Sequence, residues 1–214
     1  MIGLLKRAAA LSALANIVVG QNSTRYCEEL TGICYSSYVN SDGIYYRVAL
    51  PNNSTTSDAI LEIVSPVKYN WAGLAWGGHM TADPLTVAWP NGTGVVVSSR
   101  AASIYGVVPN TYDGAEYTYL KGTGVNSTHW TLTVRCKGCT RWTLFDSEIA
   151  VDGGNDTSLA FAYSSVPVDN PASNTSSFHM HEVHGSWVHN LTMAKTSNSE
   201  YDGWVTSNTL PALK

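Results

Sequence analysis

Short segments in which apolar and polar residues alternate recur along the chain from Ile33 onward. Residues 44–50 and 130–136 show the pattern most clearly, and a period of two places successive side chains on opposite faces of a β-strand. Turn sequences rich in Pro, Asn, Asp and Gly separate the segments, and no helical period follows the N-terminal leader. The sequence therefore predicts an all-β fold, an antiparallel sandwich or barrel. Further strands are expected at residues 59–64, 70–76, 85–89, 94–99, 116–120 and 159–163.

Residues 1–20 have the features of a secretory signal peptide. Lys6 and Arg7 supply the basic region, residues 8–19 supply the apolar run, and small residues precede Gln21. The run is too short to span a membrane, and no later stretch approaches about 18 apolar residues. We therefore expect a soluble protein that is secreted and extracellular.

The chain of 214 residues can form one domain with an ample core. We place this domain at residues 21–195. Residues 196–214 are polar apart from Trp204 and are expected to form a C-terminal tail. This tail lacks the hydrophobic end of a lipid-anchor signal.

The charge balance limits the kinds of partner. The chain has 12 Lys and Arg against 16 Asp and Glu, and two of the basic residues lie in the leader. Cleavage would leave 10 basic and 16 acidic residues, a net charge of −6. An acidic chain argues against nucleic acid or an anionic membrane as partner, and is compatible with metal cations or a basic protein surface.

The chain carries eight Asn-x-Ser/Thr sequons, which in a secreted protein predict glycosylation on outward-facing turns. The acceptor residues are Asn22, Asn52, Asn53, Asn91, Asn126, Asn155, Asn174 and Asn190.

The four cysteines form two local pairs in the sequence, Cys27 with Cys34 and Cys136 with Cys139. In an oxidising compartment disulfides are the default interpretation, and of three possible connectivities we favour the two local ones. A zinc site made by all four cysteines would require the two pairs to meet. Covalent haem attachment needs a His directly after the second cysteine, but Thr140 stands there.

Four of the six histidines lie between residues 178 and 194: His179, His181, His184 and His189. Imidazole is the commonest protein ligand for metals, with zinc, copper and iron all within its range. The alternation from residue 187 to 193 predicts a strand, so the cluster lies where a loop enters a strand and Gly185 permits the bend. The competing interpretation is a polar loop whose histidines face water.

A second stretch, residues 71–100, combines glycines with a possible soft ligand. Gly73, Gly77 and Gly78 allow a strand end to bend sharply or a flat ligand to approach the backbone. Met80 directly follows His79 at that bend. A methionine is commonly a core residue, but a thioether paired with an imidazole is also an established axial ligand set for haem iron.

Five motifs in order support one family resemblance. They are Tyr26-Cys27 with Gly32-Ile-Cys34, Gly78-His-Met80, Ala88-Trp-Pro90 with Ser98-Ser-Arg100, Cys136-x-x-Cys139-x-x-Trp142, and His181-x-x-x-Gly185-x-Trp187 followed by Leu191 and Ala194. Over residues 26–195 the chain resembles the cytochrome domain of fungal cellobiose dehydrogenases and the related stand-alone iron reductase domains. These domains share the immunoglobulin-like β-sandwich of DOMON-type (dopamine β-monooxygenase N-terminal-like) proteins.

The resemblance implies a non-covalent haem b whose iron has Met80 and His181 as axial ligands. Family members usually have no histidine at the positions of His79, His179 and His184. These three extra imidazoles crowd the two candidate ligands, so His184 remains the alternative to His181, whose spacing to Gly185 matches the family pattern. Trp71, Trp76 and Trp187 are expected to line the haem slot, or else to be ordinary core residues. Lys195 is expected to meet a haem propionate, or else water.

With both axial positions filled, the resemblance implies electron transfer rather than substrate conversion. It implies a flavin dehydrogenase as electron donor, and ferric iron or a copper polysaccharide monooxygenase as acceptor. The chain has no Gly-x-Gly-x-x-Gly turn, so the flavin must be on another protein or domain.

Two other functions stay open at this point. One is a copper- or zinc-binding protein that uses His179, His181 and His184. The other is a carbohydrate-binding sandwich that uses exposed aromatics among its 7 Trp and 12 Tyr. A hydrolase is unsupported, because no acid pair or Ser-His-Asp set stands out.

Overall fold

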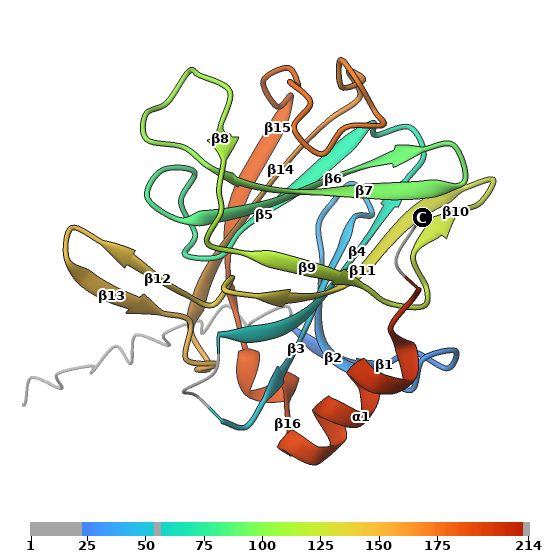
Figure 1. Cartoon of the computed structure of the whole chain (residues 1–214), viewed down its shortest axis with the longest axis vertical. Coiled ribbons are helices and arrows are strands. Elements are labelled where there is room, and N and C mark those ends of the chain that lie inside the picture. The colour runs from blue at the N-terminus through green and yellow to red at the C-terminus, as the bar shows by residue number, and fades with distance from the viewer. Residues whose placement is uncertain (1–22, 54–56, 212–214) are drawn as a thin grey trace, which may run out of the picture.

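Two antiparallel β-sheets pack face to face in the computed structural model (Figure 1). The structure describes residues 23–53 and 57–211. The expected signal peptide, the Asn22 sequon and the last three residues of the expected tail lie outside these ranges. Each of the eight strands expected between residues 44 and 163 overlaps an observed strand, and the predicted antiparallel sandwich is confirmed.

The first sheet has the strand order β1-β2-β3-β4-β11-β10, with β16 added beside β3 and β9 beside β11. All of its pairings are antiparallel except that of β16 with β3. Its strands are β1 (Thr24–Cys27), β2 (Cys34–Val39), β3 (Tyr45–Pro51), β4 (Asp58–Pro66), β9 (Glu116–Tyr119), β10 (Gly124–Val125), β11 (His129–Lys137) and β16 (Lys195–Thr196).

The second sheet has the order β15-β14-β5-β6-β7-β8, and all of its pairings are antiparallel. Its strands are β5 (Trp71–Ala75), β6 (Pro84–Asn91), β7 (Gly94–Ala101), β8 (Asn110–Thr111), β14 (Thr157–Ser164) and β15 (Val183–His189). A separate hairpin of β12 (Arg141–Leu144) and β13 (Ser147–Ala150) projects from the side of the sandwich (Figure 1).

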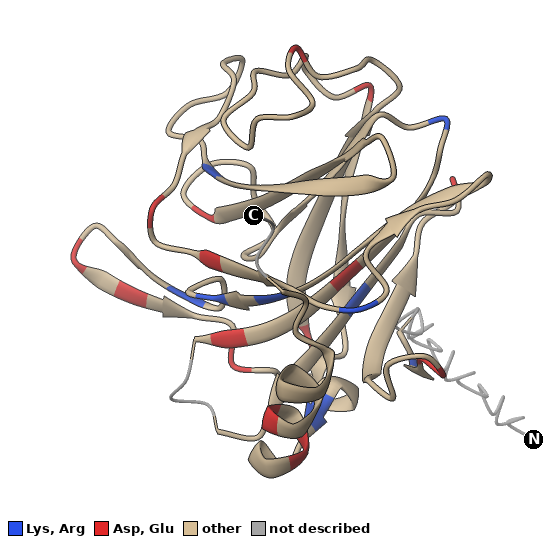
Figure 2. Cartoon of the chain, turned by 45° about the vertical axis from the view of Figure 1, so that its right-hand side comes forward, with Lys and Arg blue, Asp and Glu red and all other residues tan. Residues whose placement is uncertain are grey.

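The main hydrophobic core lies between the sheets. Tyr46 and Leu61 of the first sheet and Leu74 and Ala88 of the second all belong to it and are at most 1% exposed. Burial of such side chains is the main stabilising term of a sandwich. Charged residues lie mainly on the first sheet, the hairpin and the C-terminal helix, whereas the second sheet has few (Figure 2).

The expected tail begins with β16 and continues as helix α1 (Asn198–Asn208). Tyr201 and Trp204 pack against Ile33 and Ile60 in a cluster on the first sheet. The sequence did not indicate this helix, because only a few of its residues are apolar and it contains Gly and several poor helix formers. Packing therefore stabilises α1, and its residues are part of the folded body. Neither α1 nor the short 3₁₀ helix η1 (Leu191–Ala194), the helices of the described residues, is long and apolar enough to cross a membrane.

The strand expected at residues 187–193 lies four residues earlier in the chain than predicted, because β15 covers Val183–His189. β15 ends at His189, and Leu191–Ala194 forms a 3₁₀ helix, η1. Asn190 caps η1, because its side chain accepts a hydrogen bond from the Thr192 amide at 3.1 Å. Asparagine competes well for such local hydrogen bonds, and this ends the strand.

Both local cysteine pairs are disulfide-bonded. Cys27–Cys34 joins β1 to β2, and Cys136–Cys139 closes the turn after β11. The described residues include no free cysteine. These bonds exclude the four-cysteine zinc site considered from the sequence.

His189 is fully buried at the end of β15, on the face that points into the sandwich. Its Nδ1 accepts a hydrogen bond from the Trp187 indole at 3.0 Å and lies 3.1 Å from the Ser23 hydroxyl. Burial disfavours the charged ring and lowers the pKa of His189 from 6.5 to about 4. The unfolded chain therefore takes up this proton at a higher pH than the folded chain. The resulting stabilisation is present above pH 6.5 and is lost as the pH falls through 4.

We expect a His189→Gln variant to be less sensitive to acid than the wild type. Between pH 7 and pH 4, the wild-type free energy of unfolding should fall by about 3 kcal/mol more than that of the variant, given the size of the pKa shift. Urea unfolding at a series of pH values measures this difference. Parallel losses in the two proteins would exclude His189 as the responsible group.

Candidate cofactor pocket

A cavity of about 740 Å³ lies on the face of the second sheet that points away from the first sheet. Gly73 and Ala75 of β5 and Ala160 and Ala162 of β14 line it at the centre of the sheet. These positions are direct neighbours, since Gly73 pairs with Ala162 and Ala75 with Ala160. Four small residues in two adjacent rows make a low, flat and apolar floor.

The rows extend to both sides of this floor. On the β6 side Val87 pairs with Gly73 and Leu85 with Ala75. On the β15 side His184 pairs with Ala162 and Ser186 with Ala160. All four of these residues line the cavity.

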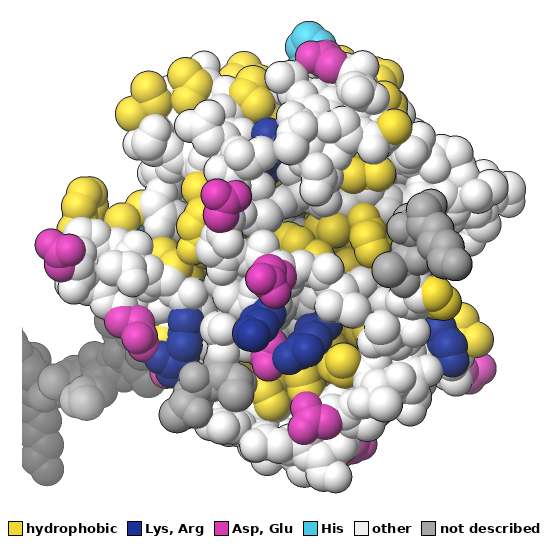
Figure 3. Space-filling model, viewed as in Figure 1, with side chains coloured by type: hydrophobic (Ala, Val, Ile, Leu, Met, Phe, Trp, Pro, Cys, Tyr) yellow, Lys and Arg dark blue, Asp and Glu magenta, His cyan; other side chains and the backbone are white. Residues whose placement is uncertain are grey.

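Two loops enclose the cavity above this floor. Tyr105 and Val107 come from the loop before β8, and Phe178 and Met180 from the loop between β14 and β15. Tyr105 and Met180 are largely exposed, and hydrophobic side chains gather along the upper edge of the molecule in Figure 3. The cavity is therefore apolar within and opens at an apolar rim. Such concave, mostly apolar sites are typical of cofactor pockets.

The two residues expected to be axial ligands, Met80 and His181, both line this cavity. They come from separate loops, and 100 residues of chain separate them. His184, the alternative ligand, lines the same cavity, as do His79 and His179. The structure thus brings together the two sequence stretches that carried the resemblance.

A glycine turn around a carboxylate holds Met80. Asp83 is buried and accepts a hydrogen bond from the His79 amide at 2.8 Å. Burial raises the pKa of this carboxyl, and the backbone hydrogen bonds from His79 and Gly77 oppose the shift. A side chain at Gly77 would collide with the carboxyl group. Gly78 has φ +89°, and a Cβ there would lie 2.5 Å from the Ser158 hydroxyl oxygen. Both glycines are therefore required for the path of this turn.

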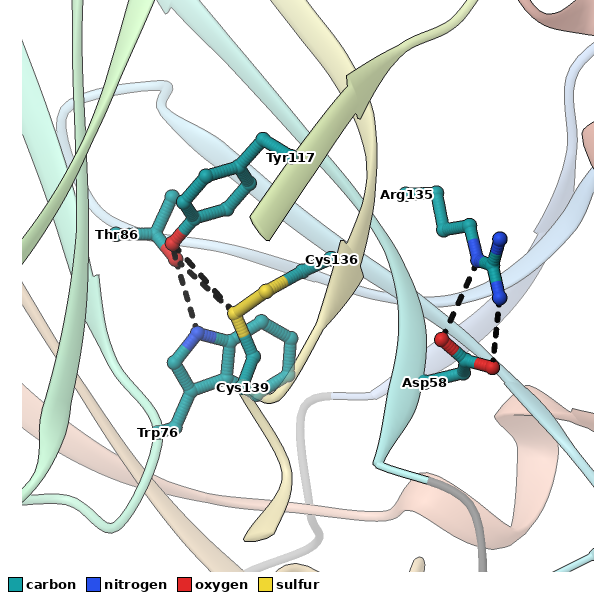
Figure 4. Close-up of a disulfide and its surroundings, with 7 residues drawn as sticks. All are labelled: Asp58, Trp76, Thr86, Tyr117, Arg135, Cys136 and Cys139. Atoms are coloured by element: carbon teal, nitrogen blue, oxygen red, sulfur yellow. Dashed lines mark hydrogen bonds and ion pairs between the residues drawn. A yellow bond between two sulfur atoms is a disulfide. The ribbon is translucent and has the colours of Figure 1, made fainter. Parts of the chain in front are cut away.

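The residue before the turn, Trp76, anchors it to the main core (Figure 4). Its indole donates a hydrogen bond to the Thr86 hydroxyl at 2.9 Å. The same Thr86 hydroxyl lies 2.7 Å from the Tyr117 hydroxyl. Tyr117 belongs to the first sheet and lies beside the Cys136–Cys139 disulfide, with its hydroxyl 3.5 Å from the Cys139 sulfur. Hydrogen bonds across the core thus fix the chain at Trp76, four residues before Met80.

The loop that carries His181 is held at its base by Glu182. The carboxylate accepts hydrogen bonds from the Ser165 amide at 2.6 Å and the Ser164 hydroxyl at 3.1 Å. These hydrogen bonds lower the pKa of Glu182. The Glu182 amide donates a hydrogen bond to the Tyr163 carbonyl at 3.1 Å. This hydrogen bond extends the pairing of β14 with β15 by one residue. His181 therefore lies at the rigid end of the loop.

The imidazole of His181 is suited to bind a metal. It is half-buried, and its ring centroid lies 4.7 Å from that of His184. Burial, followed by the nearby His184 charge, lowers the pKa of His181. The ring is therefore neutral near pH 7, and a metal requires the neutral form. The other two cavity histidines, His79 and His179, are mostly exposed.

Of the other residues expected around the slot, only Trp71 lines the cavity. It is 3% exposed, and its ring packs against Phe178 with centroids 5.0 Å apart. Trp76, directly after β5, and Trp187, on β15, both pack with the core between the sheets, so neither lines the cavity. Lys195 is also outside it, because β16 pairs with β3 and the lysine side chain lies over Gly153.

Sequence reasoning missed most of the apolar lining. Phe178 stood next to the histidine cluster, but a single aromatic residue carries little signal. The alternation of small residues at 73 and 75 and again at 160 and 162 was visible, and it could have indicated a flat floor. The loop at residues 105–109 had no motif that connected it to the site.

The described residues contain no group of three or more His, Cys, Asp or Glu side chains that could hold a metal ion.

Comparison with known proteins identifies the fold and the family. The sequence model described as the cytochrome domain of cellobiose dehydrogenase matches residues 26–202. A pyrroloquinoline quinone-dependent pyranose dehydrogenase of Coprinopsis cinerea is 28% identical over 199 residues, covering 91% of this chain. The match covers only 27% of that protein, so the chain spans about a quarter of its length.

Two solved structures have the same fold. The cytochrome domain of Myriococcum thermophilum cellobiose dehydrogenase aligns with a TM-score of 0.80 and 27% identity, over 91% of this chain and 100% of that one. The cytochrome b domain of the C. cinerea pyranose dehydrogenase aligns with a TM-score of 0.75 and 23% identity, over 84% and 93% of the two chains.

The close approach at Gly78 leads to a prediction about the Met80 turn. We expect Gly78→Ala to lower the free energy of unfolding by about 2–4 kcal/mol, because it adds a steric overlap to the cost of a left-handed backbone. Gly92→Ala is the matched control, since Gly92 also has a positive φ but a Cβ there meets nothing within 4 Å. It should cost only about 1–2 kcal/mol. Urea unfolding of both variants tests this, and equal losses would contradict the role given to Ser158.

Proposed function

The chain belongs to the family of cytochrome domains of cellobiose dehydrogenase, and from this premise we propose that it is a secreted b-type cytochrome. In this proposal it carries single electrons and holds a non-covalent haem b in the cavity of the second sheet. The observation that carries the proposal is that Met80 and His181 line one apolar cavity with a flat floor.

The residues present fit a haem in size and chemistry. A cavity of about 740 Å³ is within the range of cofactor sites, and its floor of Gly and Ala leaves space for a flat ring. Trp71, Phe178, Leu85 and Val87 would contact the apolar part of the ring. The open rim allows charged groups at the edge of a porphyrin to reach water.

Met80 and His181 are the proposed axial ligands, with His184 as the alternative imidazole. A haem with both axial positions filled supplies one-electron transfer and has no open position for oxygen or substrate. The task of the chain is to supply one sulfur and one neutral imidazole nitrogen and to keep the ring in an apolar site. Methionine ligation raises the reduction potential, and burial tunes it further.

For the electron donor we propose a sugar dehydrogenase on another protein or domain. The family name favours a flavin dehydrogenase of the cellobiose dehydrogenase type. A quinone enzyme is a specific second candidate, because the 28% identical relative is a pyrroloquinoline quinone-dependent pyranose dehydrogenase. Ferric iron and a copper polysaccharide monooxygenase are the proposed acceptors. Reduction of ferric iron is the activity of an iron reductase.

We also propose that the protein is secreted and glycosylated. The leader sequence, the two disulfides and the positions of the sequon asparagines support this. Six of the seven described acceptors are exposed and one, Asn190, is half-buried: Asn52, Asn53, Asn91, Asn126, Asn155, Asn174 and Asn190.

Optical spectra of the protein loaded with haem b test the ligand assignment. The wild type should show a six-coordinate spectrum in both oxidation states. Met80→Ala should shift it to that of a haem with an open position, and His181→Ala should weaken haem binding by about tenfold or more, since it removes the stronger ligand. Met193→Ala is the control, because Met193 lies in η1 and does not line the cavity. If the wild type binds no haem, the proposal is wrong. If His184→Ala rather than His181→Ala weakens haem binding, His184 is the ligand.

Stopped-flow mixing tests the electron donor. We expect the haem bands of the wild type to become reduced when sugar is added with a flavin-dependent cellobiose dehydrogenase fragment that lacks its own cytochrome. A pyrroloquinoline quinone-dependent pyranose dehydrogenase fragment is the parallel arm, and the faster arm identifies the donor class. The donor assignment is wrong if dithionite reduces the haem but neither enzyme does.

A further inference from the structure

Arg100 is an isolated charge in the sheet that carries the cavity. The six strands of the second sheet contain one Lys, Arg, Asp or Glu residue, and it is Arg100, near the end of β7. It is 3% exposed. Among the described residues, no carboxylate forms an ion pair with it. Burial lowers the pKa of its guanidinium, although arginine remains charged at any physiological pH. A buried charge without a counter-ion is costly, so its retention needs a reason.

The strand register places Arg100 on the cavity face. It pairs with Leu85, which pairs with Ala75, which pairs with Ala160. These positions form one row across the sheet, and the last three line the cavity. Arg100 therefore stands at the end of the floor, beyond the last lining residue of that row.

Four hydrogen bonds take the place of a counter-ion. Nε donates to the Ser98 hydroxyl at 2.6 Å, and Nη1 donates to the Pro109 carbonyl at 3.1 Å. Nη2 donates to the carbonyl of Ser176 at 2.6 Å and to that of Asn174 at 3.2 Å. Ser98 in turn donates to the Asn174 carbonyl at 2.5 Å. Every group that accepts from Arg100 is neutral.

Both loops that enclose the cavity receive these hydrogen bonds. Pro109 ends the loop whose residues 105–109 line the cavity. Asn174 and Ser176 belong to the loop that continues into Phe178 and His181. The guanidinium also lies 5.3 Å from the centre of the Phe178 ring. One side chain thus ties both loops to the end of the floor.

We propose that Arg100 is a positioning residue that fixes the two cavity loops and, through the second loop, the place of His181. This inference rests on the proposed haem site for its functional consequence, but the loop anchoring is a property of the chain alone. The planar fork is essential to the role, because a lysine keeps the charge but has three donors on one flexible nitrogen and cannot reach both loops in the same way.

The test compares Arg100→Lys with Arg135→Lys. Arg135 is the matched control, since it also makes two hydrogen bonds through its fork, to Asp58 at 3.2 and 2.9 Å, but lies on β11 of the first sheet (Figure 4). We expect Arg100→Lys to release haem b to apomyoglobin about tenfold faster than the wild type, the effect of losing one or two net hydrogen bonds. Arg135→Lys should release it at the wild-type rate. Unchanged release and an unchanged axial-ligand spectrum in Arg100→Lys overturn the proposal.

Amide hydrogen exchange of the haem-free proteins provides a readout that does not depend on haem. In Arg100→Lys, exchange should increase in residues 103–109 and 170–181 and stay unchanged in the first sheet. If the wild type binds no haem, the proposed function fails, and exchange alone still decides whether Arg100 fixes the loops. Wild-type exchange in both loops overturns the proposal. If Arg100→Lys does not fold, Ser98→Ala replaces it, with the same direction and a smaller effect expected.

Discussion

The register of the second sheet is the constraint on which the site depends. Side chains of a strand alternate between two faces, and here the faces carry residues of different size. Leu74 of β5 and Trp76, directly after it, point into the core, while Gly73 and Ala75 of β5 point to the cavity. A shift of one residue would put the large side chains on the cavity face and open holes in the core. Correct packing of the sandwich therefore also determines that the outer face is flat.

The two proposed ligands reach the site in different ways. Met80 follows a short turn whose start is held by the core, because Trp76 hydrogen-bonds to Thr86 between the sheets. His181 comes from a longer loop that is held at its base by Glu182 and further out by Arg100. A rigid sheet can place residues on loops only where such contacts exist. The buried polar groups around the cavity thus hold its turn and loops in place, whereas the lining itself is mostly apolar.

The sequence predicted more of the fold than of the site. The strands were visible because alternation is a local signal. The expectation that Met80 and His181 act together came from the family resemblance and stays a prediction. The lining residues Phe178 and Val107 were not visible, since their meeting depends on where two loops close over a sheet. Trp76 and Trp187 illustrate the limit in the other direction, because proximity in sequence to a ligand does not show which strand face a side chain occupies. Helix α1 was missed because packing rather than a periodic pattern stabilises it.

The fold and the cavity are supported by different clusters of residues. The main core lies between the sheets, whereas Trp71, Leu85, Val87 and Phe178 form a separate cluster on the outer face with Met80 packed against it. Most of the apolar burial is in the first of these, so loss of a contact in the outer cluster leaves the sandwich intact. Substitutions at residues 80 and 181 should therefore change the cavity and leave the folding of the sandwich intact.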